Sequence, residues 1–518
     1  MRTYLYATVF ITGMTTLAVE FAASRLLGNY FGASNLVWAS IVGLILIYLT
    51  VGYFLGGRWA DRSPEYGTFF KILCWGSFAV GLVPVIARPI LSIASRAFDA
   101  LQVGVMAGSF IVVLILFSVP ITLLGTASPF AIRLAITDPR TVGVTSGRVY
   151  AISTLGSFIG TFLPVLILIP WLGTFRTFLF FSLITLITAL IGLAMTKNQR
   201  AALTLVWMPV VIIILFVIGF PGTDKPTEGL VYETESAYNY IQVVQSGEFT
   251  YLRLNEGQGI HSIYHPTQID FKGPWDMAVA APFFNPPPIS PDQITSMAIV
   301  GLAAGTTARQ ATAVYGPDLM IDGIEIDPTI IEVARTYFNM TEPNLNVITE
   351  DGRWALAHST NSYQIISVDA YRPPYIPWHL TTQEFFQTAR DHLTSDGVLV
   401  INVGRTPDDR RMVSALYSTL ASVFPSVFVV DLPLTFNTMI YATMQPTHID
   451  NLIINLGLME KEENIHPLLL RTMRTALENL QLEPEPGIVF TDDKAPVEGI
   501  TNSIVIDFFL SGQTELIQ

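Results

Sequence analysis

The sequence predicts an α-helical membrane domain of seven helices, followed by a small antiparallel β-sheet and a doubly wound α/β domain. Seven apolar segments occupy residues 1–220, and each is long enough to cross a bilayer. Short β-rich runs follow over 230–264, and strand and helix patterns alternate from residue 297 onward. We therefore expect a membrane domain at 1–220, a linker and small β-domain at 221–290, and an α/β domain at 291–518.

The net charge of the chain changes sign between its two halves. Residues 1–220 carry 13 Lys/Arg and 5 Asp/Glu (net +8), and the remainder carries 15 and 36 (net −21). The acidic second half argues against nucleic acid as a partner, because affinity for a phosphate backbone comes largely from Lys and Arg. It would suit a cationic molecule such as a polyamine. The single cysteine, Cys74, excludes an intrachain disulfide, and no metal is expected.

The apolar segments predict an integral membrane protein, with the lipid bilayer as a partner. Glu20 and Arg25 stand in the first segment in place of a clean cleavage site, so this segment is expected to be a spanning helix. Charge is costly in lipid, and Glu20 should therefore face other helices, with Arg25 as a possible partner. The segments are Leu5–Leu27, Leu36–Leu55, Ile72–Leu91, Val105–Leu124, Val149–Leu172, Thr177–Met195 and Ala202–Phe220.

Small residues in two of these segments have the spacing that lets membrane helices approach closely. They lie in Gly52-Tyr-Phe-Leu-Gly-Gly-Arg58 and in Gly156-Ser-Phe-Ile-Gly160. Without a large side chain at the contact, two helix backbones can come together. These residues are expected to pack helices rather than to bind a ligand.

The α/β domain opens with a strand, a glycine turn and a helix. In Met297-Ala-Ile-Val-Gly-Leu-Ala-Ala-Gly-Thr-Thr-Ala-Arg309, a buried strand is expected to end at Gly301 and a helix to begin near Thr306. Gly301 and Gly305 let the backbone approach a ligand, and the helix N-terminus behind them offers free N–H groups.

Acidic residues follow the next strands of the same domain. Glu325 ends the second strand, where an acid can accept both hydroxyls of a ribose. Asp351 and Gly352 follow a third strand, where a carboxylate can reach an adenine amine, and Asp369 ends a fourth. These acids would share one edge of a parallel sheet and predict a nucleoside site. The alternative is that they cap helices in an ordinary α/β domain.

Together, these features resemble the spermidine synthase family, in particular the membrane-fused spermidine synthase-like proteins of prokaryotes. The resemblance covers nearly the whole chain and rests on the order of several short motifs. In the first half they are Glu20-Phe-Ala-Ala-Ser-Arg25 and Gly56-Gly-Arg-Trp-Ala-Asp-Arg62. In the second they are Leu254-Asn-Glu-Gly-Gln-Gly-Ile-His-Ser262, Glu325-Ile-Asp-Pro, Asp351-Gly-Arg, Asp369-Ala-Tyr, Pro377-Trp-His-Leu-Thr-Thr-Gln-Glu-Phe385 and Thr491-Asp-Asp-Lys-Ala-Pro-Val-Glu498.

The resemblance implies a β-domain followed by a Rossmann-like methyltransferase fold. It also implies transfer of an aminopropyl group from decarboxylated S-adenosylmethionine to an amine. Glu325 would then hold the ribose and Asp351 the adenine. Asp369 would orient and deprotonate the attacking amine, which cannot act as a nucleophile while it is protonated.

The chain departs from the family pattern at three places. Ala304 occupies the position of an acid that would bind the cationic end of the aminopropyl group. Arg372 occupies the position of a second acid, and a positive charge beside Asp369 should disfavour a cationic substrate. The Tyr-His-Glu signature of the soluble family is replaced by Gly273-Pro-Trp-Asp-Met277. The residues expected to bind the nucleoside thus match the family pattern better than those expected to bind the amine.

Three further residues are candidates for binding a substrate. His379 and His261 lie in segments that could line the pocket, and a histidine near Asp369 could act as a base. Tyr371 could cover a ligand. Each could instead serve only in packing or in structural hydrogen bonds.

The sequence leaves three functions open. The first is a membrane-bound aminopropyl transferase. The second is a methyltransferase that uses intact S-adenosylmethionine, which the loss of the acid at Ala304 would permit. The third is a non-catalytic scaffold or accessory subunit, with other membrane subunits or a second copy of the chain as partners.

The side of the membrane on which the second half lies also remains open. Basic residues gather in the loops after the second, fourth and sixth segments, which places that side in the cytoplasm. Seven crossings would then put the acidic half outside a prokaryotic plasma membrane. Use of an adenosyl cofactor, which is made in the cytosol, would instead require the cytoplasmic side.

Overall fold

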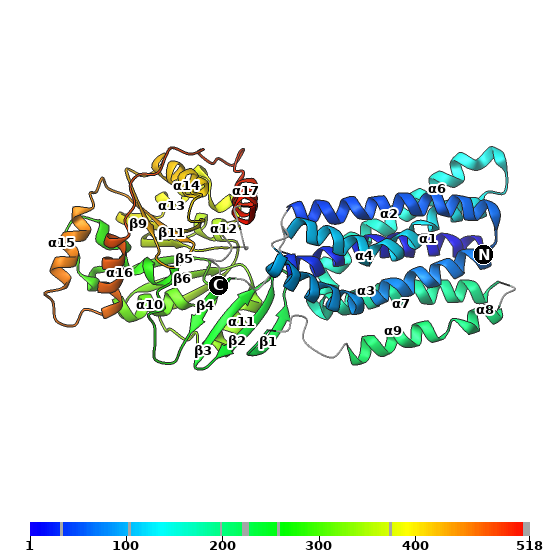
Figure 1. The fold of residues 1–518 in the computed structure, drawn as a ribbon, viewed down its shortest axis with the longest axis horizontal. Helices are drawn as coiled ribbons and strands as arrows, with labels where there is room; N and C mark the ends of the chain where they lie inside the picture. Colours follow the sequence, from blue (N-terminus) through cyan, green and yellow to red (C-terminus); the bar gives the residue numbers. More distant parts are fainter. Residues whose placement is uncertain are drawn as a thin grey trace. The chain divides into compact units, whose positions relative to one another are not determined.

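A computed structural model describes residues 1–31, 35–101, 105–196, 199–219, 227–255, 259–371 and 375–510 of the chain. The chain separates into two compact units (Figure 1). Unit 1 comprises Met1–Thr227 and Thr234–Tyr240, and unit 2 comprises Glu228–Glu233 and Ile241–Gln518. The expected linker around residues 220–226 lies outside the described residues.

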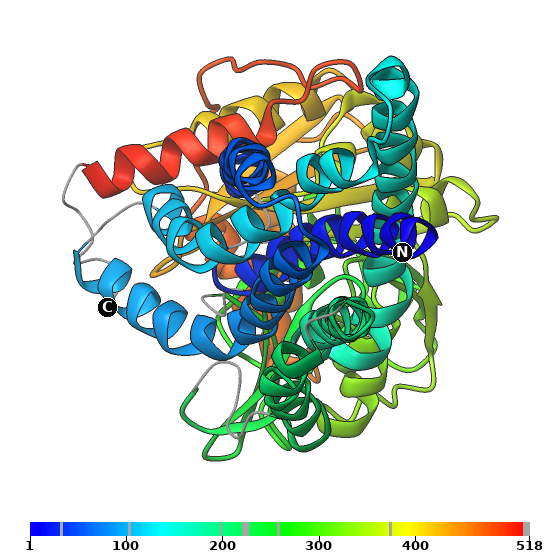
Figure 2. The same ribbon diagram turned by 90° about the vertical axis from the view of Figure 1, so that its right-hand side faces the viewer.

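Unit 1 is a bundle of apolar helices, and the N-terminus lies toward the end that faces the viewer in Figure 2. α1 packs along α6 and α7, α2 along α4, and α3 along α4 and α7. The helices are α1 (Arg2–Phe31), α2 (Asn35–Arg62), α3 (Tyr66–Leu101), α4 (Val105–Gly125), α5 (Ala127–Ala135), α6 (Val142–Leu163), α7 (Ile169–Ala194), α8 (Gln199–Thr204) and α9 (Trp207–Ile218).

The described part of unit 1 contains six helical runs that are long and apolar enough to cross a membrane. The predicted count of seven is not confirmed. Two predicted segments, Val149–Leu172 and Thr177–Met195, begin in one apolar run, Pro139–Ala194, which includes a π-helical turn at Pro164–Leu168. The one non-helical residue inside α7 is Gly173, with φ of 77° and ψ of 167°. The apolar run is therefore kinked at Gly173, between the two predicted segments, and one helix ends there and another begins.

Gly156 and Gly160 of α6 lie against the backbone of α1, as their spacing predicted. A Cβ atom on Gly156 would lie 2.0 Å from the carbonyl oxygen of Phe10. One on Gly160 would lie 2.0 Å from the carbonyl oxygen of Met14. Any side chain at these positions would force the two helices apart. The same close approach occurs at Gly52 and Gly56 of α2, which face Thr122, Gly125 and Thr126.

We expect Gly156→Leu to destabilise unit 1 by about 1–3 kcal/mol, because overpacking shifts backbone that cannot yield. Thermal unfolding of the detergent-solubilised chain measures the effect. Gly147→Leu is the matched control, since it lies on the same helix with no atom within 4 Å of the added Cβ. Equal melting temperatures for the two variants would contradict the role of Gly156 in helix packing.

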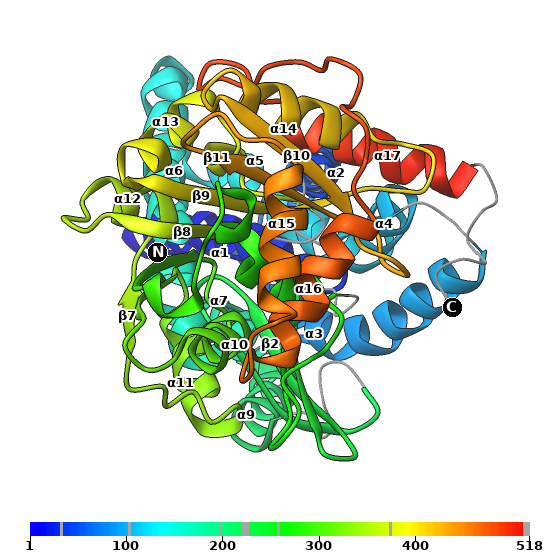
Figure 3. The same ribbon diagram turned by 90° about the vertical axis from the view of Figure 1, so that its left-hand side faces the viewer.

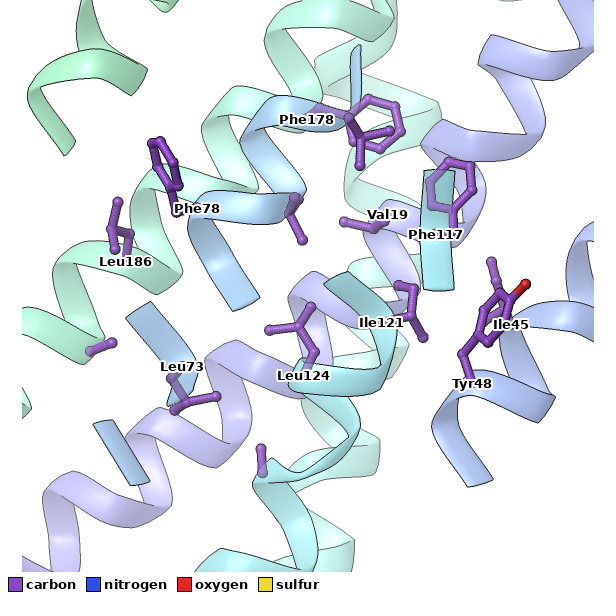
Figure 4. Packing of buried hydrophobic residues seen from close by; sticks show 14 of the residues in the cluster. Val19, Ile45, Tyr48, Leu73, Phe78, Phe117, Ile121, Leu124, Phe178 and Leu186 are labelled. Atoms are coloured by element: carbon purple, nitrogen blue, oxygen red, sulfur yellow. The ribbon is translucent and has the colours of Figure 1, made fainter. Parts of the chain in front are cut away.

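The interior of unit 1 is built from apolar side chains of several helices (Figure 4). Phe117 of α4 and Phe178 of α7 are fully buried, and their ring centroids are 6.3 Å apart. Buried hydroxyl groups in this unit are hydrogen-bonded to backbone carbonyl oxygens or to one another. The hydroxyls of Thr15 and Thr185, for example, lie 2.6 Å apart. Such pairing avoids the cost of an unsatisfied polar group in an apolar interior.

Polar groups of α1 and α7 bind the segment Thr234–Tyr240, which also belongs to unit 1. The carboxylate of Glu235 accepts hydrogen bonds from Asn29 Nδ2 at 2.6 Å and from the hydroxyl and amide of Thr174 at 2.7 and 2.8 Å. Arg25 donates to two backbone oxygens of the same segment, at 2.7 and 3.1 Å. Arg25, which the sequence suggested as a partner for Glu20, therefore binds this segment.

A small antiparallel sheet precedes the α/β domain, as the sequence predicts, and its strand order is β1-β2-β3-β4. β2 and β3 form a hairpin in which Ser246 pairs with Phe249, and Gly247 turns the chain with φ of +60°. The strands are β1 (Leu230–Glu235), β2 (Tyr240–Ser246), β3 (Phe249–Leu254) and β4 (Ile260–Tyr264).

The α/β domain contains a seven-stranded sheet with the order β10-β11-β9-β8-β5-β6-β7. The prediction of a parallel sheet is wrong for one strand, because β11 runs antiparallel to both β10 and β9. A connection as short as residues 432–436 allows a hairpin but no crossover helix. The strands are β5 (Ser296–Val300), β6 (Met320–Glu325), β7 (Leu345–Thr349), β8 (Tyr363–Val368), β9 (Leu393–Gly404), β10 (Ser426–Asp431) and β11 (Asn437–Thr443).

Helices cover both faces of this sheet and bury two separate cores (Figure 3). Alternate residues of β5 contribute to the two cores: Met297 and Ile299 to one, Ala298 and Val300 to the other. The first face is covered by α10 (Thr306–Tyr315), α11 (Pro328–Tyr337), α15 (Asp450–Met459) and α16 (Pro467–Glu478). The second is covered by α12 (Gly352–Ala357), α13 (Gln383–Asp391), α14 (Arg411–Ala421) and α17 (Val497–Leu510).

Candidate functional site

The strand order of the large sheet changes direction between β5 and β8. β6 and β7 follow on one side of β5, and β8 lies on the other. In open α/β sheets, ligands bind in the crevice beyond the strand ends at such a switch point. Here the amide of Asp369, which follows β8, donates to the carbonyl of Val300 at 2.9 Å. A Cβ on Gly301 would lie 2.5 Å from the carbonyl oxygen of Asp369, so glycine permits this close contact.

The predicted glycine turn follows β5 and leads into α10. Gly301 has φ of +95°, Ala303 +48° and Gly305 +82°, and α10 begins at Thr306. The amide of Ala303 donates to Glu325 Oε2 at 3.0 Å. The turn and the acid at the end of β6 are therefore joined directly, as the spacing in the sequence suggested.

Strand β4 of the small sheet supports the glycine turn from outside the α/β domain. The amide of Ala304 donates to Ser262 Oγ at 2.9 Å. The hydroxyl of Thr306 exchanges hydrogen bonds of 3.0 Å with the backbone amide and carbonyl of Ile263. Ala304, which stands where the resemblance implies an acid, is 1% exposed. Sequence reasoning did not predict this contact, because nothing local to the serine or the threonine signals it.

Glu325 is a buried carboxyl at the end of β6. Its two oxygens accept hydrogen bonds from the amides of Ala303 (3.0 Å) and Asp327 (3.1 Å). Burial raises the pKa of Glu325 to about 7, and the backbone hydrogen bonds oppose this rise. The group can therefore change its charge near neutral pH when a ligand approaches.

Asp351 caps the helix α12 and also meets His379. Its Oδ1 accepts from the amides of Arg353 and Trp354, each at 3.0 Å. Its Oδ2 lies 3.0 Å from His379 Nε2. The capping role that the sequence left as an alternative is thus present, and Gly352 brings the turn against β5. A Cβ on Gly352 would lie 2.5 Å from a methyl of Val300.

A second ion pair joins this turn to a distant segment of the chain. Arg353 binds Asp492 through both of its terminal nitrogens, at 2.7 and 2.8 Å. Thr382 donates to the same carboxylate at 2.8 Å. The guanidinium holds the pKa of Asp492 below its usual range. The motif Thr491-Asp-Asp-Lys therefore lies beside α12, a placement that the sequence did not predict.

Asp369 is half-buried beyond β8 and is held by an asparagine of the next strand. Asn402 Nδ2 donates to Asp369 Oδ1 at 2.9 Å. Burial raises the pKa of Asp369 to about 6, and the bond from Asn402 opposes this rise. Tyr371 donates its hydroxyl to the carbonyl of Asn402 at 3.1 Å, and burial together with Asp369 raises the pKa of this tyrosine. Arg372, whose charge was expected to act on Asp369, lies outside the described residues.

His261 lies in β4 beside the serine that supports the glycine turn. Its Nε2 is buried without a hydrogen-bond partner among the described residues. Burial lowers the pKa of His261 to about 4, so the ring is neutral at pH 7. Its carbonyl accepts from the indole of Trp275 at 3.2 Å. The two histidines therefore have different partners. The backbone carbonyl of His261 binds Trp275, and the ring of His379 contacts Asp351.

The segment that replaces the Tyr-His-Glu signature contains a fully buried acid, Asp276. Its carboxylate accepts from the amide of Lys272 at 2.7 Å and from the side-chain amide of Gln310 at 2.5 Å, and it pairs with Arg471. These bonds tie three segments of unit 2 together, which is a structural role. Among the described residues, no group of three or more His, Cys, Asp or Glu side chains is placed to hold a metal ion.

The sheet order and the two helical layers define a Rossmann-like α/β domain. Residues 296–453 match the spermine/spermidine synthase domain. The chain is 34% identical over 287 residues to a probable polyamine aminopropyl transferase of Bifidobacterium longum, covering 52% of this chain and 61% of that protein. It is 29% identical over 212 residues to a polyamine aminopropyltransferase of Vibrio vulnificus, covering 38% and 65%. Residues 296–453, within the second half of the chain, therefore carry a spermine/spermidine synthase domain.

The chain spans less than two thirds of the length of either of these relatives. Among solved structures, a probable spermidine synthase from Corynebacterium glutamicum is similar with a TM-score of 0.37 at 21% identity, covering 43% of this chain and 81% of that one. Spermidine synthase from Thermotoga maritima gives a TM-score of 0.39 at 18% identity, covering 48% and 83%.

Proposed function

We propose that the second half of this chain transfers an aminopropyl group from decarboxylated S-adenosylmethionine to a small amine. The observation that carries the proposal is the row of carboxyl groups at one edge of the sheet. Glu325, Asp351 and Asp369 follow β6, β7 and β8, and Asp369 lies against the glycine turn after β5. In this proposal the apolar helices of unit 1 anchor the enzyme in a bilayer.

The nucleoside part of the donor would lie over the glycine turn. Glu325 would accept hydrogen bonds from the ribose hydroxyls, and its carboxylate is already oriented by two backbone amides. Asp351 would accept from the adenine amine, with His379 and the α12 amides holding its carboxylate in place. Gly301 would let the backbone approach the donor without a Cβ in the way.

The reaction forms a C–N bond and breaks a C–S bond. The amine acceptor first loses a proton to Asp369, whose pKa near 6 leaves it ionised at pH 7. The free amine then attacks the aminopropyl carbon next to the sulfonium. The C–S electron pair leaves with sulfur, which gives neutral methylthioadenosine and a charged secondary amine. Placement of the amine in line with that carbon supplies much of the rate.

Methyl transfer from intact S-adenosylmethionine is the second candidate. The observation that favours it is Ala304, which is buried and presents no acid to a cationic aminopropyl tail. A third possibility is a site that has lost its chemistry and serves only as a scaffold. Asp369 and its raised pKa speak against this, because they supply the base that the transfer needs.

Calorimetric binding of the detergent-purified chain to three ligands tests the proposal. They are decarboxylated S-adenosylmethionine, intact S-adenosylmethionine and methylthioadenosine. We expect the decarboxylated form and methylthioadenosine to bind, and the decarboxylated form with an amine to give product. Preference for the intact form would support methyl transfer. Binding of none of them by a folded sample would support the scaffold.

A further inference from the structure

Asn402 is a buried polar residue in the middle of an apolar strand. It lies in β9 and is 4% exposed, and its neighbours Val400, Ile401 and Val403 are fully buried. Burying an amide is costly unless its hydrogen bonds are made. The position of Asn402 therefore depends on the partners that surround it.

Both ends of the Asn402 amide have partners. Its Nδ2 donates to Asp369 Oδ1 at 2.9 Å, and its Oδ1 accepts from Asn437 Nδ2 at 2.9 Å. Asn437 pairs with Gly404 across β9 and β11, which puts it on the same face of the sheet as Asn402. Because Asn437 donates to the oxygen, the nitrogen of Asn402 must point toward Asp369. The amide cannot flip without losing both bonds.

Among the described residues, Asn402 is the only side chain that forms a hydrogen bond with the carboxylate of Asp369. Tyr371, on the same segment, bonds to the backbone of Asn402. Arg405, just beyond β9, pairs with Asp431 at 3.2 Å. On the other side of the glycine turn, Glu325 is occupied by backbone amides. No cation among these groups stabilises the ionised form of Asp369.

We infer that Asn402 is a positioning residue that orients Asp369 toward the acceptor amine and keeps its carboxyl ionised at neutral pH. This inference rests on the proposed function, because it assumes that Asp369 takes a proton from the amine. Asn437 fixes the direction of the Asn402 side-chain amide, and it acts on Asp369 only through that amide. Within the described part of the chain, neither asparagine side chain forms a hydrogen bond with Glu325 or Asp351.

The test is the pH profile of transfer for Asn402→Leu, which removes the amide at nearly equal volume. A hydrogen bond to a charged group is worth about one to two pH units in the pKa of its acceptor. The acid limb of the profile should therefore move upward by about one to two units. Activity at pH 7 should fall about 2- to 10-fold and should recover largely at pH 9. A profile that falls in height without moving would overturn the inference.

Two further variants separate positioning from damage to the fold. Asn437→Leu frees the Asn402 amide to rotate, so a smaller shift in the same direction is expected. Asn455→Leu is the matched control, because Asn455 is also fully buried and bonds only to backbone groups of residues 283, 285 and 289. It should lower the melting temperature and leave the pH profile in place. A shift as large as that of Asn402→Leu would contradict the specific role.

A second readout keeps the inference separate from the proposed function. Putrescine binding is measured by calorimetry from pH 5.5 to 9 with methylthioadenosine present. Binding of the diammonium ion requires ionised Asp369 and reports its charge whether or not transfer occurs. An inactive wild-type chain whose putrescine binding shifts upward in Asn402→Leu would refute the proposed transfer but support the role of Asn402. No shift in this binding would refute the role itself.

Discussion

Asp369→Asn is expected to lower the rate of aminopropyl transfer by about 10²- to 10⁴-fold, the usual contribution of a positioned general base. The substitution keeps the shape of the side chain but removes the group that accepts the proton of the amine. Nucleoside binding should change little, because the carboxylates of Glu325 and Asp351 are held by other described residues and not by Asp369. Single-turnover transfer and methylthioadenosine binding, measured on the same sample, give the two values.

The pH dependence of the wild-type chain supports the same assignment. Burial raises the pKa of Asp369 to about 6, so transfer should fall tenfold per unit below that pH, as the base becomes protonated. The matched control is Asp391→Asn, since Asp391 lies at the end of α13 and its carboxylate accepts a hydrogen bond from the side chain of Gln387 on the same helix. Unchanged turnover in Asp369→Asn would remove this residue from the mechanism.

Glu325→Gln is expected to weaken methylthioadenosine binding by about 10- to 100-fold. Hydrogen bonds to a charged group contribute about 1.5–3 kcal/mol, and the neutral amide cannot accept both ribose hydroxyls as a carboxylate does. In the wild-type chain, the backbone N–H groups of Ala303 and Asp327 each donate to one oxygen of the carboxylate. The side-chain NH₂ group of the introduced glutamine would face one of these donors and could not accept its hydrogen bond. Calorimetry at pH 8 measures the loss. Unaltered affinity would mean that the ribose lies elsewhere.

The pH dependence of this binding has a defined sign. Burial raises the pKa of Glu325 to about 7, and ribose hydroxyls favour its ionised form, so binding should release a proton near neutral pH. Affinity should increase as the pH rises to about 7 and then level off. Calorimetric titrations in two buffers of different ionisation enthalpy measure the number of protons that are released on binding. Asp369→Asn should keep this profile and Glu325→Gln should lose it.

The stability of the ligand-free domain should respond in the opposite direction. A carboxyl whose folded pKa lies above its unfolded value stabilises the fold at low pH, and this contribution is lost as the pH rises through the folded pKa. For Glu325 the loss is expected between the ordinary range of a glutamate and about pH 7. For Asp369, the same stabilising contribution is expected to be lost between the ordinary range of an aspartate and about pH 6.

The sequence predicted the features that depend on local pattern. Long apolar segments indicated the helical half. The count of seven is not confirmed, because two of the predicted segments lie in one apolar run that is kinked at Gly173. The glycine turn after β5 and the acid at the end of β6 lie where their spacing placed them. A strand and a turn of this type are set by residues close together in the chain, so the pattern is visible in one dimension.

The tertiary structure decided which distant side chains complete the candidate site. Ser262, Asn402 and Asp492 come from a separate sheet, a later strand and the last part of the chain, and each now binds a residue of the predicted site or its adjoining turn. It also set the antiparallel direction of β11, which follows from a short hairpin connection. Hydrogen bonds between residues 33 to 139 positions apart leave no periodic signal in the sequence, because only the packing of whole elements brings the partners together.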